Sequence, residues 1–193
     1  MAAGEVQILA FVGAPAAGKT VAAAVAKEIG IPVVTMGDVI RGELQRRKLS
    51  LSDANAGSIA NELREREGMD AIARRCIPRI KDINAKEGEK AKKSTIVIDG
   101  IRGIAEVETF KKEFGTDFIL VKIEAPLVLR YNRIKTRGRG DDLLNIEEFK
   151  EREEREKRWG MGEAMEKAEK VITNEDSLEE FKEQIKRILD IKE

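Results

Sequence analysis

The stretch Gly13-Ala14-Pro15-Ala16-Ala17-Gly18-Lys19-Thr20 decides the fold. It matches G-x-x-x-x-G-K-[ST], the pattern of a phosphate-binding loop. An apolar run, Gln7 to Val12, precedes the loop, and an Ala-rich segment, Thr20 to Ile29, follows it. A strand, a glycine-rich loop and a helix in this order are the context that the motif requires, which an ordinary Gly-rich turn would lack. The sequence therefore predicts a nucleotide-phosphate site at residues 13–20.

Each residue type in the motif has a chemical reason. Gly13 and Gly18 allow a close approach of the backbone, so that successive N–H groups can surround phosphate oxygens. A helix that begins near Lys19 adds the positive end of its dipole. Lys19 can neutralise the β- and γ-phosphates, and the Thr20 hydroxyl can bind Mg²⁺. We therefore expect ATP and Mg²⁺ as ligands.

Apolar runs and helical patterns alternate along the chain, as in α/β proteins with a parallel sheet and helices on both faces. The expected strands span residues 7–12, 31–35, 95–98, 118–123 and 171–173. The last helix should begin at Ser177, because Glu180 completes a capping box. The connections 36–93 and 127–170 are long and mostly helical, which indicates movable covers near the strand ends.

The composition excludes several kinds of chemistry. The 193 residues indicate one domain, and 36 basic against 36 acidic residues give no net charge, so nucleic acid is not an expected partner. Without histidine there is no Ser-His-Asp or Cys-His catalysis and no His-bound zinc.

The single cysteine, Cys76, fits a helix core and indicates a reducing cytoplasm. We find no apolar run of about 18 residues and no signal peptide, so no membrane is expected. The 37% of charged residues is typical of a thermophile.

Two further segments place a carboxylate beside a guanidinium. In Met36-Gly37-Asp38-Val39-Ile40-Arg41, Asp38 and Arg41 can share one face of a first helical turn. The carboxylate could hold a metal-bound water and the guanidinium a phosphate, or Asp38 could simply cap the helix and pair with its neighbour. In Asp99-Gly100-Ile101-Arg102, the carboxylate ends a strand where α/β proteins bind ligands; a surface salt bridge is the alternative.

A cationic block runs from Arg130 to Arg139 without any acidic residue. Such a block repels itself unless anions meet it. Arg133 and Arg137 are four apart, so one helical face could present both to a triphosphate. Arg152 and Arg155 follow on a helix of alternating charges, for which a solvated face is the alternative.

In these stretches the sequence resembles the nucleoside-monophosphate kinases, adenylate kinase above all. Those enzymes carry a phosphate loop, a T-G-D-x-[LI]-R segment, a D-G-[FY]-P-R segment and an R-x-x-x-R start of an Arg-rich lid. The resemblance runs in order from Phe11 to the last helix and looks closest to an archaeal family of adenylate-kinase-related P-loop proteins. Residues 171–180 also resemble the terminal part of dephospho-coenzyme A kinases.

The resemblance implies a P-loop NTPase fold with five parallel strands in the order 2-3-1-4-5. One domain, residues 1–193, would contain a helical acceptor-binding insert at 37–93 and a helical lid at 136–158. The phosphate loop with Lys19 would hold the donor phosphates. Arg133 would stack on the donor base and Arg137 would reach its phosphates. Arg152 or Arg155 would be the catalytic lid arginine.

Further roles follow from the same resemblance. Asp38 and Asp99 would organise a hydrated Mg²⁺ together with Thr20. Arg41 and Arg102 would bind the phosphate of the acceptor. These assignments predict two anionic ligands, one in the phosphate loop and one at the ends of the neighbouring strands.

Three departures leave the identity of the acceptor open. The third segment lacks Pro and is one residue shorter, and Met36 replaces the usual Thr. Glu106 stands where adenylate kinases commonly have a Gln that reads the acceptor adenine. An ionised carboxylate can accept hydrogen bonds but cannot donate them. The expected acceptor-binding residues are thus Asp38, Arg41, Arg102 and Glu106.

The predicted activity is transfer of the γ-phosphoryl group of ATP to a small phosphorylated acceptor, first of all a nucleoside monophosphate such as AMP. One alternative keeps the reaction and changes the acceptor to dephospho-coenzyme A or another small metabolite. Another is a nucleotide-dependent switch or ATPase acting on RNA or protein. A GTPase is disfavoured because the Asn-Lys-x-Asp guanine signature is missing. The protein is expected to be a monomer or a small homo-oligomer.

Overall fold

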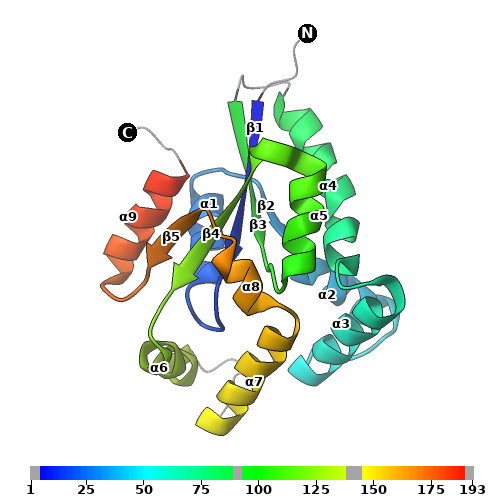
Figure 1. Ribbon diagram of the computed structural model, residues 1–193, viewed down its shortest axis with the longest axis vertical. Helices are drawn as coiled ribbons and strands as arrows, with labels where there is room; N and C mark the ends of the chain where they lie inside the picture. Colours follow the sequence, from blue (N-terminus) through cyan, green and yellow to red (C-terminus); the bar gives the residue numbers. More distant parts are fainter. Residues whose placement is uncertain (1–4, 89–92, 138–144, 190–193) are drawn as a thin grey trace.

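Five parallel strands form the centre of the protein (Figure 1). The structure, a computed structural model, describes residues 5–88, 93–137 and 145–189. The order across the sheet is β2-β3-β1-β4-β5, as predicted. The strands are β1 (Glu5–Val12), β2 (Val33–Thr35), β3 (Lys93–Asp99), β4 (Phe118–Glu124) and β5 (Lys170–Thr173).

The central strands are apolar on both faces because helices cover both sides of the sheet. Leu9 and Phe11 of β1 point into a core formed with α1 (Lys19–Glu28) and α9 (Leu178–Ile188). Ile8 and Ala10 point into the opposite core, formed with α4 (Ala71–Gly88) and α5 (Ile104–Phe114). Figure 1 shows these two helix pairs on opposite sides of the sheet. The alternation along β1 thus confirms the predicted three-layer arrangement.

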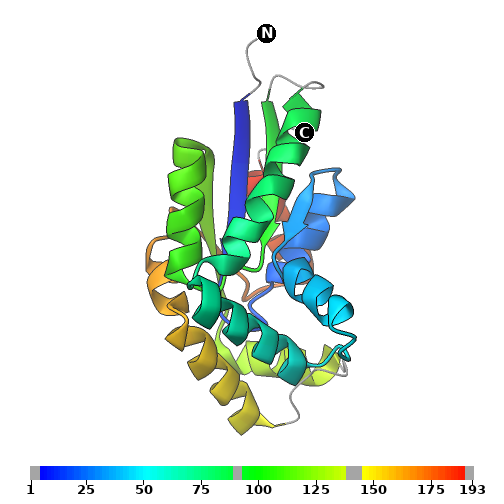
Figure 2. The ribbon, with the colours of Figure 1, turned by 90° about the vertical axis from the view of Figure 1, so that its right-hand side faces the viewer.

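The long connections consist largely of helices, as predicted. Between β2 and β3 lie α2 (Gly37–Arg46), α3 (Asp53–Glu67) and α4. Between β4 and β5 lie α6 (Leu127–Arg137), α7 (Ile146–Arg158) and α8 (Met161–Glu166). Figures 1 and 2 place α3, α6 and α7 at the end of the sheet where the strands end. The functional boundaries 37–93 for an insert and 136–158 for a lid stay predictions.

The register brings the ends of the central strands level with one another. Asp99 at the end of β3 pairs with Phe11 of β1 on one side and with Thr35 of β2 on the other. The segments after these three strands therefore meet at one edge of the sheet, where ligands bind in α/β proteins. None of the described helices combines the length and low charge that crossing a membrane requires.

Candidate functional site

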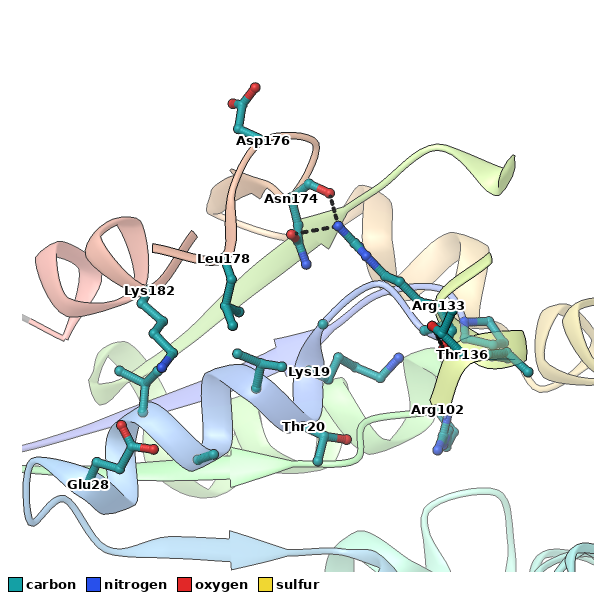
Figure 3. A pocket seen from close by; sticks show the side chains of 17 residues that line it. Lys19, Thr20, Glu28, Arg102, Arg133, Thr136, Asn174, Asp176, Leu178 and Lys182 are labelled. Carbon is teal, nitrogen blue, oxygen red and sulfur yellow. Dashed lines mark hydrogen bonds between the residues drawn. The ribbon is translucent and has the colours of Figure 1, made fainter. Parts of the chain in front are cut away.

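The phosphate loop connects β1 to α1 and carries its lysine folded back over the loop. The Lys19 ammonium donates a hydrogen bond to the Gly13 carbonyl and a second one, of 3.0 Å, to the Ala14 carbonyl. Lys19 is 8% exposed, whereas Thr20 is exposed. Both residues line a cavity of about 810 Å³ (Figure 3). The loop thus presents an amine and a hydroxyl to the same space.

Gly18 is required by the packing behind the loop. Its φ angle is +123°, in a region that favours glycine. A Cβ atom at this position would lie 2.4 Å from Asn174 Nδ2 and 2.8 Å from the Phe181 ring. Gly18 thus allows the phosphate loop to pack closely against the segment around β5 and α9. Ala16 adopts a positive φ of 60° without being glycine.

The cavity lies between α1, α6 and the segment that connects β5 to α9. Its polar lining includes residues from the phosphate loop, from the end of β3 and from α6 (Figure 3). Val21, Ala24, Val25, Ile134 and Leu178 make up most of its apolar lining. A lining that combines charged, hydroxyl and apolar side chains suits a nucleotide, which has a charged phosphate chain and a flat base.

Asn174 joins the phosphate loop to α6. Its side-chain amide donates a 2.8 Å hydrogen bond to the Ala17 carbonyl. Its main-chain and side-chain oxygens each accept a 2.9 Å hydrogen bond from Arg133 Nη2, drawn as dashed lines in Figure 3. Asn174 was not among the predicted site residues. Two signals were available: its position directly after the last short strand, and its place in the stretch 171–180 that resembles dephospho-coenzyme A kinases.

Arg133 has an unused donor beside the cavity. Its Nη1 atom is buried and has no hydrogen-bond partner among the described residues. Burial lowers the pKa of the Arg133 guanidinium, because it removes the charged group from water. An anionic or polar ligand atom would satisfy this donor. The lining residues therefore fit a nucleotide, with Arg133 beside the expected donor site.

Arg102 follows β3 and also lines the cavity, together with Lys19 and Thr20. Its Nη1 atom forms a 2.9 Å ion pair with Glu156 of α7, and this carboxylate raises the pKa of the Arg102 guanidinium. Its backbone N–H donates a 2.7 Å hydrogen bond to the carboxylate of Glu106. The structure thus brings one of the two expected acceptor arginines beside the phosphate loop.

Glu106 was expected to bind the acceptor, but its side chain does not line the cavity. Its side chain is 1% exposed and forms a 3.1 Å ion pair with Arg64 of α3. Burial raises the pKa of Glu106, and the contacts with Arg64 and with the Arg102 N–H oppose this effect. The Trp159 ring covers the Arg64 guanidinium at 4.4 Å. The Glu106 carboxylate can be buried because Arg64, 42 residues earlier, pairs with it.

Asp38 and Arg41 pair with each other at the start of α2. Arg41 Nε donates a 3.1 Å hydrogen bond to Asp38 Oδ1, and Arg79 of α4 donates a 3.2 Å bond to Asp38 Oδ2. The side chains of Asp38 and Arg41 are about half exposed, and neither lines the cavity. The neighbour pairing weighed as an alternative for Asp38 is thus present, whereas capping by its side chain is not.

Other predicted site residues stay untested. The side chains of Arg137, Arg152 and Arg155 lie outside the described part of the structure. Within the described residues, no cluster of three or more acidic, His or Cys side chains could hold a metal ion. A Mg²⁺ ion held by Thr20 and a carboxylate would therefore take further oxygen ligands from the nucleotide phosphates, which suits this ion.

The fold and the phosphate loop define a P-loop protein. Residues 12–150 match the family model described as an AAA domain. A UPF0200/UPF0201 protein of Archaeoglobus fulgidus is 54% identical over 185 residues, which cover 96% of this chain and 55% of that protein. A UPF0200 protein of Methanosarcina barkeri is 50% identical over 183 residues, covering 95% and 94%. The chain belongs to this AAA domain family and to the UPF0200 proteins.

The fold is also similar to that of a solved kinase. Dephospho-CoA kinase from Campylobacter jejuni superimposes with a TM-score of 0.59 and 15% sequence identity, covering 95% of this chain and 96% of that one. At this identity the likeness concerns the fold alone. It supports the P-loop fold over nearly the whole chain.

Proposed function

We propose that this protein is an ATP- and Mg²⁺-dependent kinase that transfers the γ-phosphoryl group to a small phosphorylated acceptor, first of all a nucleoside monophosphate such as AMP. The observation that carries the proposal is that Lys19 and Thr20 of the phosphate loop share one cavity with Arg102 from the end of β3. Cations from two separate segments can hold a donor and an acceptor phosphate next to each other.

The proposed reaction asks the protein for position and charge rather than for covalent chemistry. Lys19 and the loop N–H groups neutralise the donor phosphates, Arg133 binds beside them, and Arg102 holds the acceptor phosphate. A phosphate acceptor is already an anionic nucleophile, so a general base such as histidine is not needed. Bound Mg²⁺ would supply further neutralisation of the phosphate charge.

The first test removes the charge in the phosphate loop. We expect Lys19→Ala to lower phosphoryl transfer by about 10²-fold or more, because a preorganised cation at the developing charge is lost. Transfer from ATP·Mg²⁺ is measured against a panel of nucleoside monophosphates. Lys27→Ala is the matched control, since Lys27 is an exposed lysine of the same helix. Near-full transfer by Lys19→Ala would defeat the proposal.

A second acceptor belongs in the same panel. Residues 171–180 resemble dephospho-coenzyme A kinases, and the fold of one such kinase superimposes on this chain. Preferential phosphorylation of dephospho-coenzyme A would keep the reaction and replace the acceptor. ATP hydrolysis that responds to RNA and needs no acceptor would instead favour the switch or ATPase.

A further inference from the structure

The Arg102 guanidinium has a protein carboxylate as its ion-pair partner. Glu156 approaches from α7, 54 residues away in the sequence, and its Oε1 atom lies 2.9 Å from Arg102 Nη1. The Arg102 side chain is 29% exposed and the Glu156 side chain only 4%. The pair thus lies at the wall of the cavity, with the guanidinium nearer to the ligand space and the carboxylate behind it.

We propose that Glu156 is a specificity-determining residue, a carboxylate that an acceptor must displace from Arg102 by offering a stronger anion. The role of Arg102 in this inference rests on the proposed function. Arginine binds carboxylates and phosphates through the same N–H donors, so Glu156 and an acceptor phosphate would compete for Arg102 Nη1.

The competition selects a chemical class of acceptor. A carboxylate carries one negative charge, whereas a phosphate monoester carries about 1.5 to 2 and has three strong acceptor oxygens. A phosphate monoester can therefore replace Glu156 at Arg102. A carboxylate would bind Arg102 no more strongly than Glu156 does, and a neutral hydroxyl would bind it more weakly. Glu156 accordingly favours phosphomonoesters over carboxylate and hydroxyl compounds.

The surroundings of Arg102 provide a built-in reporter. The Arg102 backbone N–H donates a hydrogen bond to Glu106, which anchors the main chain beside the side-chain pair of Arg102 with Glu156. Trp159, three residues after Glu156, covers Arg64 with its ring and is the only tryptophan of the chain. Its carbonyl lies 1.9 Å from the position of a Cβ atom at Gly103, directly beside Arg102. Movement of Glu156 should therefore change the fluorescence of Trp159.

The experiment titrates the whole protein with inorganic phosphate and, separately, with acetate while Trp159 fluorescence is recorded. A saturating non-hydrolysable ATP analogue with Mg²⁺ first fills the phosphate loop. We expect a saturable response to phosphate and a much weaker one to acetate. In Glu156→Gln, phosphate should bind about five- to tenfold more tightly, because one competing ion pair is lost. Glu154→Gln, an exposed glutamate of the same helix, should bind as the wild type does.

Three further variants test this interpretation. Arg102→Ala should lose the phosphate response, and adding Glu156→Gln to Arg102→Ala should then change nothing further. If Glu156→Gln does not fold, Glu156→Asp keeps the charge but shortens the reach, and tighter phosphate binding is again expected. Unchanged or weaker phosphate binding in a folded Glu156 variant, or a full response in Arg102→Ala, would overturn the inference. Because no transfer is measured, absence of kinase activity with an intact titration would reject only the proposed reaction.

Discussion

Asn174 connects three segments that are far apart in the sequence. Its side-chain amide donates a hydrogen bond to the Ala17 carbonyl of the phosphate loop. Its two oxygens each accept a hydrogen bond from Arg133 of α6. We expect Asn174→Ala to lower the free energy of unfolding by about 1–3 kcal/mol, because buried polar groups lose their partners. Urea unfolding measures this loss, and nucleotide binding should weaken as well. Glu175→Gln, at the exposed neighbouring position, is the control; an equal effect of both changes would contradict this role.

The phosphate loop and Glu106 differ in how well their roles can be predicted from local sequence. The loop is a contiguous motif, so its type and place follow from local sequence. Arg102 follows from the rule that ligands bind at strand ends, and it does line the cavity. Whether Glu106 points to a ligand or to the interior depends on Arg64, which belongs to another helix. No local pattern contains that information.

At the scale of elements, α2 and α3 are joined by an ion pair between Arg47 and Glu62. The Arg47 hydrogen bond, with a further one from Arg66, lowers the pKa of Glu62 to about 2 from the ordinary 4.5. A lowered pKa in the folded state means that the contact stabilises above pH 4.5 and is lost as the pH falls toward 2. We expect carboxyl NMR to show Glu62 titrating near pH 2.

Unfolding experiments supply the control for this ion pair. The difference in stability between wild type and Glu62→Gln should shrink as the pH falls from about 4.5 to about 2. Glu65→Gln removes an exposed charge from the same helix and controls for net charge. A Glu62 titration at its ordinary pH would show that the pair does not form in solution.

The elements themselves were largely predictable. Continuous apolar runs gave all five strands, and the capping box gave the start of α9 after Ser177. The second strand is shorter than expected, beginning at Val33 instead of Ile31. Pro32 has no N–H to donate to a ladder, and only its carbonyl is used, by Val97 at 2.9 Å. The strand order came from the family resemblance, since alternation alone specifies only parallel neighbours.

On the scale of the whole molecule, three segments meet around one buried ion pair. Arg64 comes from α3, Glu106 from α5, and Trp159 from the end of α7. Gly103 permits this meeting, because a side chain there would collide with the Trp159 carbonyl. Helices α3 and α5 and the end of α7 therefore share a contact beside Arg102.

Removing one partner of this ion pair should be more harmful than removing both charges. Arg64→Met leaves the Glu106 carboxylate buried without its cation, which should cost about 3–5 kcal/mol of unfolding free energy. The double change Arg64→Met with Glu106→Gln should recover a large part of that loss, because no unpaired charge remains. Urea unfolding followed by Trp159 fluorescence measures both. Arg66→Met, an exposed arginine of α3, is the control. Equal costs for the single and double variants would mean that packing of the Arg64 side chain on Trp159, and not its charge, joins the three segments.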